Sequence, residues 1–233
     1  PAEWTNAAAV PVSITPGSNA AFTEYRLEGA TVQDWTEYSS AFQITAEGET
    51  VITARSIDAY GGVSPEVAAT VKIDRSPPII EINAATDDEE AYRDGSWTKY
   101  PVTVAADFSD SFSGIDAASI KYALNDGSLM PYTEPIRVAD EGEHLLHFQA
   151  SDRIGNTREL SFAVKIDKKP PLNPTLQVSP TGWSSGEVTF TLSAQPDQDG
   201  GSGIAKMCYR YGDSEEWIDY EGPVTVSAEG EVI

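Results

Sequence analysis

The sequence predicts an all-β chain of three tandem antiparallel β-sandwiches, and two observations lead to that prediction. First, a tryptophan, a tyrosine and the tripeptide Glu-Gly-Glu recur in the same order, with a period of roughly 90 residues. Second, apolar and polar residues alternate with period two between these landmarks, as half-buried strands require, and no helical stripe is present. Such a period is too long for a solenoid unit and suits a small domain, so the 233 residues form an array of similar modules.

The landmarks set the expected module boundaries. The three copies open at Trp4, Trp97 and Trp183, and the Glu-Gly-Glu steps are residues 47–49, 141–143 and 229–231. Two copies close with Val-Lys-Ile-Asp and a proline pair, at residues 71–78 and 164–171. Proline cannot continue a strand ladder and restricts the residue before it. The predicted modules are therefore residues 1–76, 77–169 and 170–233.

Within the middle module, alternation predicts six short strands separated by turn residues. They are expected at residues 79–82, 102–105, 120–124, 136–138, 144–150 and 160–166. In the same register, the first module lacks the strand that should precede Trp4, and the third stops before its last strands. We therefore expect only the middle module to be complete, within a longer native chain.

The composition of the chain argues against some classes of binding partner. The formal net charge is −22, from 37 acidic and 15 basic residues. A field of this sign repels phosphate backbones and anionic lipid, which argues against nucleic acid as a partner. No apolar stretch approaches the 18 or so residues of a membrane span, so no membrane insertion is expected. The single cysteine, Cys208, excludes an internal disulfide and is expected to point to solvent.

With the register fixed, the chain resembles a known family. The middle copy contains Trp97 through Val102, Asp110-Ser111-Phe112-Ser113-Gly114-Ile115, the Glu-Gly-Glu step and Asp152-Arg153-Ile154-Gly155-Asn156. It ends with Lys165-Ile166-Asp167 and its prolines. This order resembles the bacterial Ig-like (fibronectin-III-like) repeats of large secreted and cell-surface proteins. The resemblance implies tandem Ig-like β-sandwiches in an extracellular, secreted or cell-wall-attached protein, where such modules serve in adhesins or as spacers in polysaccharide-degrading enzymes.

Carboxylates at loops and junctions are candidate ligands for Ca²⁺, which takes six to eight oxygen ligands. The candidates are Asp107, Asp110 and Asp116 around one loop, Asp152 and Asn156 in another, and Asp167 at a junction, where Asp74 is its counterpart. No cofactor is required by this interpretation. The alternative is that Asp152 begins a turn with its side chain while Gly155 and Asn156 take left-handed conformations.

Aromatic residues are candidates for glycan binding, which needs two or three exposed rings on one face. Trp97, Tyr92 and Tyr100 are the proposed ligand-binding residues, although nothing in the sequence places them together. A further aligned position holds Trp35, Leu129 and Trp217 in the three copies. Interchange of tryptophan with leucine favours core packing there over a stacking platform.

Catalysis is not expected. His144 and His147 are the only histidines, and their spacing on one strand puts them on opposite faces. The chain has no nucleophile elbow, phosphate loop or His-Glu-x-x-His motif. Paired acids for glycoside cleavage stay open on sequence alone, although small repeated sandwiches seldom enclose a cleft.

Two functions follow as hypotheses. The first is a non-catalytic extracellular spacer whose partners are neighbouring domains of the same polypeptide. The alternative is a carbohydrate-binding or adhesion module that contacts cell-wall, host or plant polysaccharide. Glycan binding that disappears on tryptophan substitution would discriminate between them.

Overall fold

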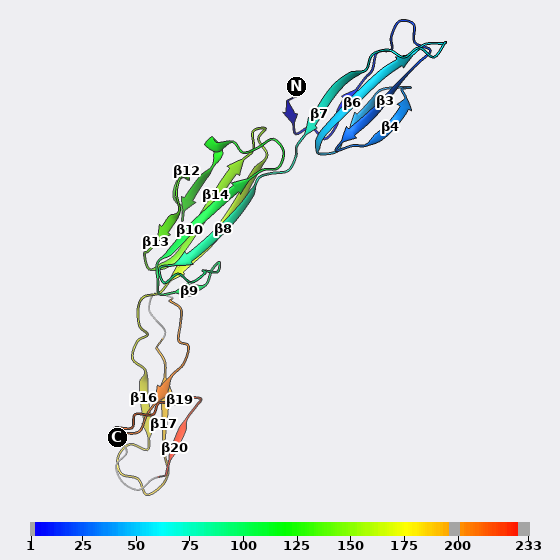
Figure 1. Cartoon of the computed structure of the whole chain (residues 1–233). Coiled ribbons are helices and arrows are strands. Elements are labelled where there is room, and N and C mark those ends of the chain that lie inside the picture. Colours follow the sequence, from blue (N-terminus) through cyan, green and yellow to red (C-terminus); the bar gives the residue numbers. More distant parts are fainter. Residues whose placement is uncertain (1–2, 196–200, 228–233) are drawn as a thin grey trace. The chain divides into compact units, whose positions relative to one another are not determined.

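The computed structural model describes residues 3–195 and 201–227 and confirms the all-β prediction (Figure 1). Several sheets compatible with β-sandwich architecture account for the regular structure of these ranges, together with one 3₁₀ turn, η1 (Ala117–Ser119). The third Glu-Gly-Glu step lies outside the described residues.

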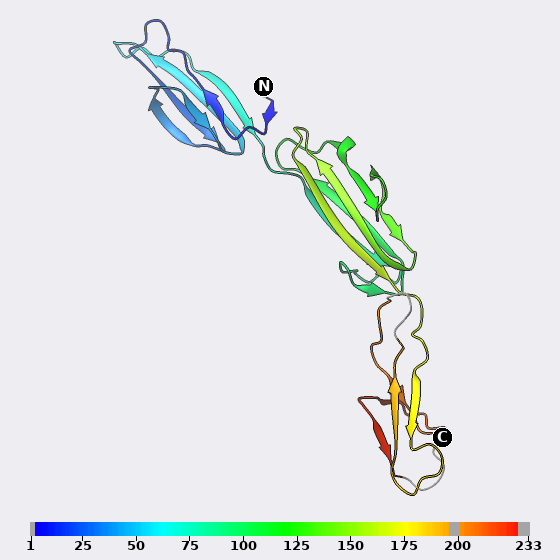
Figure 2. The same ribbon diagram turned by 180° about the vertical axis from the view of Figure 1, so that it is seen from behind.

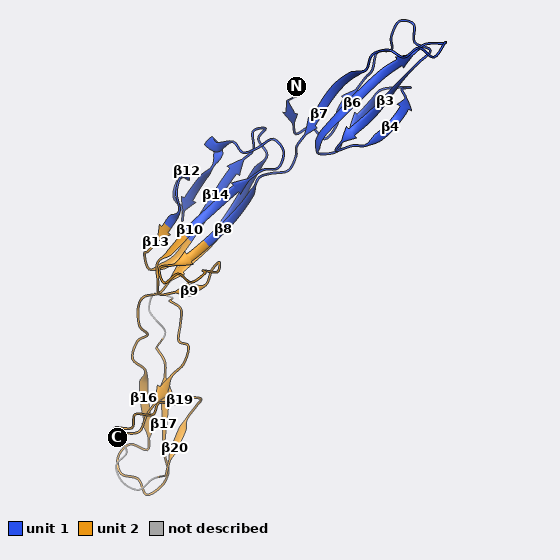
Figure 3. Cartoon of the chain, in the orientation of Figure 1, with its two compact units in different colours: residues 1–83, 104–136, 145–162 blue, residues 84–103, 137–144, 163–233 orange. Residues whose placement is uncertain are grey.

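The chain divides into two compact units (Figure 3). One comprises residues 1–83, 104–136 and 145–162, and the other comprises residues 84–103, 137–144 and 163–233. This division passes through five strands, which are β8 (Ile79–Thr86), β10 (Val102–Ser109), β13 (Ile136–Val138), β14 (Gly142–Ser151) and β15 (Thr157–Ile166). The strand pairings, in contrast, stay within the three predicted residue ranges. The module boundaries therefore remain a prediction.

The N-terminal region contains a five-stranded sheet and a two-stranded ribbon (Figures 1 and 2). In sheet order the strands are β1 (Trp4–Thr5), β7 (Val67–Ile73), β6 (Gly48–Ile57), β3 (Phe22–Gly29) and β4 (Gln33–Glu37). The ribbon pairs β2 (Val10–Val12) with β5 (Phe42–Ile44). Alternation on β3 buries Tyr25 and Leu27, and the Tyr25 ring stacks on Phe42 at a centroid distance of 4.4 Å. The core therefore lies between sheet and ribbon.

The middle region has two sheets. The larger sheet orders β12 (Met130–Pro131), β11 (Lys121–Leu124), β14 (Gly142–Ser151), β15 (Thr157–Ile166) and β9 (Trp97–Thr98). The smaller sheet orders β13 (Ile136–Val138), β10 (Val102–Ser109) and β8 (Ile79–Thr86). All six predicted strands are present, and β8, β10, β14 and β15 extend beyond the predicted ranges.

The sequence repeat is matched by a repeated strand pairing. Trp4-Thr5 lies parallel to Lys72-Ile73, and Trp97-Thr98 lies parallel to Lys165-Ile166. In each copy the lysine ammonium lies over the tryptophan ring, at 5.7 Å and 5.6 Å from its centroid. The recurring tryptophan thus marks a short parallel edge strand beside the Lys-Ile-Asp strand.

The C-terminal region contains shorter strands. They are β16 (Thr175–Ser179), β17 (Val188–Ser193) and β20 (Val224–Val226) in one sheet, with β18 (Cys208–Tyr209) paired to β19 (Ile218–Asp219). Cys208 is half-buried on β18. Its Sγ donates to Asp219 Oδ1 at 3.2 Å, and this hydrogen bond raises the pKa of the thiol.

Candidate functional site

One candidate site lies at the loops that follow β14 and β10, and the first of these loops is a turn built on Asp152. Its Oδ1 accepts hydrogen bonds from the amides of Ile154 at 3.0 Å and Asn156 at 2.8 Å. Gly155 has φ +93°, a left-handed conformation that favours glycine. The predicted turn is therefore confirmed at Gly155, but Asn156 does not take the left-handed conformation that the sequence suggested.

The second loop is a similar turn built on Asp110. Its Oδ1 accepts from the amides of Phe112 at 3.1 Å and Gly114 at 2.7 Å. Gly114, with φ +81°, accepts a hydrogen bond at its carbonyl from the Arg153 amide at 2.9 Å. Because this bond and the bridge between Ile115 and Asp152 join the loops, the two carboxylates are held close together.

Asp74, at the end of the first Lys-Ile-Asp strand, completes the site. Its Oδ1 accepts from the Ser76 amide at 3.1 Å, and its Oδ2 accepts from the Ser113 amide at 2.9 Å. Its carbonyl accepts from Asn156 Nδ2 at 3.2 Å. Asp74 has a relative exposure of 0% and Asp152 of 2%. The end of the strand is therefore seated in the two loops.

The structure thus gathers Asp74, Asp110 and Asp152, which we call the acidic junction. One oxygen from each carboxylate lies within 4.8 Å of the other two. Asp110 and Asp152 were predicted ligands, whereas Asp74 was noted only for its junction position. The signal that pointed to Asp74 was the repeated Val-Lys-Ile-Asp ending.

The other predicted ligands lie outside this group or act as donors. Asp107 is exposed on β10 and accepts from Asn83 Nδ2 at 3.5 Å. Asp116 caps η1 by accepting from the Ala118 amide at 3.0 Å, and Asp167 lies at the second Lys-Ile-Asp ending. Asn156 donates from Nδ2 to Asp152 Oδ2 at 2.6 Å, so only its Oδ1 is left to act as a cation ligand.

The charge balance of the acidic junction suits a cation. Among the described residues, none of its three carboxylates forms an ion pair with a lysine or arginine. Buried charges are normally paired or coordinate a metal. Ser113, 3% exposed, also has a buried Oγ without a hydrogen-bond partner. Ca²⁺ ligands lie 2.3–2.6 Å from the ion, so oxygens within 4.8 Å of one another fit a shared ion.

The predicted aromatic residues are not gathered into an exposed platform. Tyr92 is 8% exposed, and its hydroxyl accepts from the Lys165 amide at 2.9 Å and donates to the Ser96 carbonyl. Trp97 is half-buried in the parallel pair. Tyr100 is half-buried, with the Lys99 ammonium 5.0 Å from its ring centroid.

The aligned tryptophan position does not face a core in two of the three copies. Leu129 is 48% exposed and Trp217 is 59% exposed, so core packing is wrong there. Trp35 is half-buried, with the Arg55 guanidinium 4.0 Å from its ring centroid. Trp35 lies on β4 and Trp217 lies just before β19, and in both an arginine side chain packs over the ring.

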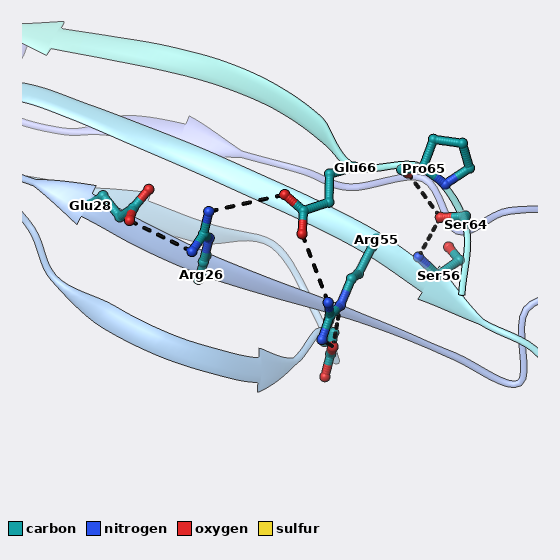
Figure 4. A network of polar contacts seen from close by, with 8 residues as sticks. Arg26, Glu28, Arg55, Ser56, Ser64, Pro65 and Glu66 are labelled. Carbon is teal, nitrogen blue, oxygen red and sulfur yellow. Dashed lines mark hydrogen bonds and ion pairs between the residues drawn. The ribbon is translucent and has the colours of Figure 1, made fainter. Parts of the chain in front are cut away.

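The arginines over Trp35 belong to a surface ion-pair network (Figure 4). Arg55 contacts Glu24 at 2.6 Å and Glu66 at 3.8 Å, and Arg26 contacts Glu66 at 4.0 Å and Glu28 at 3.6 Å. The pairs with the exposed carboxylates of Glu28 and Glu66 contribute little stability. The network covers the Trp35 ring with charge, which leaves it a poor sugar-stacking surface.

The histidines lie as predicted, on opposite faces of β14. His147 Nδ1 hydrogen-bonds Ser161 Oγ at 2.9 Å, and His144 Nε2 hydrogen-bonds the Asp140 carbonyl at 2.9 Å. Two imidazoles on opposite faces cannot share one metal ion.

No protein-family model matches the chain, and no curated protein matches it. Within residues 3–195 and 201–227, no helix has the length and apolar character needed to cross a membrane.

Proposed function

We propose that this chain is a non-catalytic spacer, built of tandem Ig-like modules, in a larger extracellular bacterial protein. The observation that carries the proposal is the seating of Asp74. A carboxylate at the end of one predicted module is buried and hydrogen-bonded by loops of the next. A joint of this kind gives each module a defined place on its neighbour, which is what a spacer requires.

The acidic junction is also the proposed Ca²⁺ site. Asp74, Asp110 and Asp152 supply three carboxylates, and Ser113 Oγ and Asn156 Oδ1 are further oxygens nearby. Such a donor set suits a hard cation. A bound ion would neutralise the carboxylates and link the end of one module to two loops of the next. Calcium titration with hydrogen exchange as the readout tests this assignment.

The alternative function is recognition of polysaccharide. Polysaccharide recognition is best tested in the third predicted module. This module contains the most exposed tryptophan rings of the described residues, Trp183 at 88% and Trp217 at 59%. Exposed rings are the usual contacts for sugar faces. The Trp217 ring is partly covered by the Arg210 guanidinium at 5.1 Å, so Trp183 is the better candidate.

Affinity electrophoresis of the full chain in gels containing cell-wall or plant polysaccharides separates the two functions. A spacer should migrate as it does in plain gel. Retardation that is lost in Trp183→Ala or Trp97→Ala, but kept in the covered-ring control Trp35→Ala, would overturn the spacer proposal in favour of glycan binding. Hydrogen exchange on each variant checks that it remains folded.

A further inference from the structure

A second Lys-Ile-Asp ending repeats the contacts of Asp74. Asp167 Oδ1 accepts from the Lys169 amide at 3.1 Å, two residues on, as Asp74 Oδ1 accepts from Ser76. Asp167 Oδ2 accepts from both the amide and the Oγ of Ser202, each at 2.7 Å. In both places one carboxylate oxygen accepts a hydrogen bond from an amide two residues on, and the other accepts from a serine far along the sequence.

The serines occupy matching positions in their motifs. Ser113-Gly114-Ile115 and Ser202-Gly203-Ile204 are the same tripeptide in successive predicted modules. Both glycines have φ +81°, a left-handed conformation that glycine adopts without steric cost. The glycine therefore shapes the turn so that the serine amide faces the incoming carboxylate.

The backbone of each aspartate is also held in the same way. The Asp74 amide donates to the Thr5 carbonyl at 2.9 Å, and the Asp167 amide donates to the Thr98 carbonyl at 2.8 Å. These bonds extend the parallel pairing of the tryptophan strand with the Lys-Ile-Asp strand. The aspartate is thus fixed to its own module through its backbone and to the next module through Oδ2.

We infer that the Ile-Asp ending and the Ser-Gly turn are a docking pair that seats each module on its predecessor. The partner recognised by the Ser-Gly turn is a carboxylate at the end of another module of this kind. The contact needs no cation, because the serine amide, and in the second case also the serine hydroxyl, supplies the donors. This inference deepens the spacer proposal and depends on it only for its biological use.

The first predicted module lacks such a turn. Its equivalent segment is Pro16-Gly17-Ser18-Asn19, in which the Gly17 amide donates to Ser56 Oγ at 3.2 Å. The Gly17 carbonyl accepts from the Ala20 amide at 3.1 Å. This turn uses its polar groups within its own module. Docking is therefore a property of modules that carry Ser-Gly-Ile, and not of every repeat.

The replacement of aspartate by asparagine tests the pair with little change of shape. Asp74 and Asp167 each use both oxygens as acceptors, so an asparagine must leave its NH₂ group facing one amide N–H. Asp58→Asn is the matched control. Asp58 Oδ1 alone accepts from Tyr60 and Gly62, both at 2.8 Å, so asparagine keeps both bonds.

The effect of each variant on the joints is measured as the width of the distance distribution between two spin labels in the full chain. The measurement is made in EDTA, and Cys208→Ser serves as the background so that labels attach only at introduced cysteines. Labels at the exposed positions Val32 and Leu129 report on the first joint, and labels at Leu129 and Leu176 report on the second. Asp74→Asn should broaden only the first distribution and Asp167→Asn only the second, by at least about twofold, since a lost docking contact frees a joint. Asp58→Asn should change neither.

Unchanged widths in both asparagine variants would overturn the docking pair, as would equal broadening in the Asp58→Asn control. Hydrogen exchange of the strands in each variant shows whether broadening of the distance distribution comes from unfolding. If an asparagine variant unfolds, Ser202→Ala provides a second variant. Ser202→Ala removes one of the two donors to Asp167 and should give an intermediate width. Because polysaccharide binding is measured separately, failure of this test is distinct from failure of the spacer proposal.

Discussion

The Asp58–Gly62 turn and the Asp152–Asn156 turn have the same construction in different surroundings. In both, the first residue donates from its amide to the carbonyl four residues on, at 3.0 Å, and the fourth residue is a left-handed glycine. Both aspartates accept two backbone amides at Oδ1. However, Asp58 is exposed, whereas Asp152 is 2% exposed. Local hydrogen bonds therefore form the turn in either setting.

What distinguishes the second turn is what covers it. Asn156 stands where the first turn has Gly62, and its Nδ2 reaches the Asp74 carbonyl at 3.2 Å. The Asp110 loop and the end of β7 close over Asp152 and bring two further carboxylates to it. This turn motif thus becomes a candidate cation site where the Lys-Ile-Asp ending supplies a third acid, Asp74.

The largest expected difference between the turns is their response to alanine. Asp152→Ala leaves the part-buried amides of Ile154 and Asn156 without their acceptor, and a polar group that is shielded from water and lacks a partner is costly. We expect a loss of about 3 kcal/mol in local stability. The matched variant Asp58→Ala should cost much less, because water replaces the carboxylate at an exposed turn.

Hydrogen exchange of the full chain, resolved to peptides that cover each turn, measures both variants. Faster exchange should extend into β14 in Asp152→Ala and stay within residues 58–62 in Asp58→Ala. An equal response at the two turns would mean that burial by the acidic junction adds nothing to the local motif.

The second expected difference is in the response to Ca²⁺. At a free calcium concentration of 100 times the dissociation constant, binding stabilises the folded site by about 2.7 kcal/mol. Protection from hydrogen exchange should rise at residues 110–114 and 152–156, reverse with EDTA, and be absent at residues 58–62. Protection at both turns, or at neither, would remove the cation from this site.

Asp110→Asn is the matched control for the calcium effect. Asp110 Oδ1 alone accepts both turn amides, so asparagine preserves the loop while it removes one ligand charge. Calcium-dependent protection should therefore fall in Asp110→Asn although the turn itself remains. Full protection in this variant would show that the ion binds elsewhere.

The strands were predictable because each depends on alternation within a few residues. The inward residues Val102, Val104, Leu146 and Phe148 are buried as that alternation requires. The parallel edge pairing of Trp4 with Lys72 was not predictable, because it joins residues far apart in sequence. Residue type alone also did not indicate that Leu129 and Trp217 are exposed.

The acidic junction was predicted only in part for the same physical reason. Asp110 and Asp152 stand in loop motifs with glycine, which are recognisable in sequence. Asp107 and Asp116 are close to Asp110 in sequence, but strand alternation turns Asp107 outward and Asp116 caps η1. Asp74 reaches the site through tertiary contacts with Ser113 and Asn156, and only the structure reveals those.

The smallest expected effect is the acid titration of the exposed turn. Hydrogen bonds from the Gly62 amide, and then from the Tyr60 amide, hold the pKa of Asp58 below its ordinary value. Because the folded pKa is lowered, the carboxylate stabilises the turn fully above the unfolded pKa of about 3.9, and this stabilisation is lost as pH falls through the folded pKa. Carboxyl-carbon NMR should follow Asp58 below the value in a peptide of residues 56–64. If Asp58 titrates at or above the peptide value, the two amides do not bind the carboxylate in solution. The two turns would then share their backbone conformation but not their side-chain hydrogen bonds.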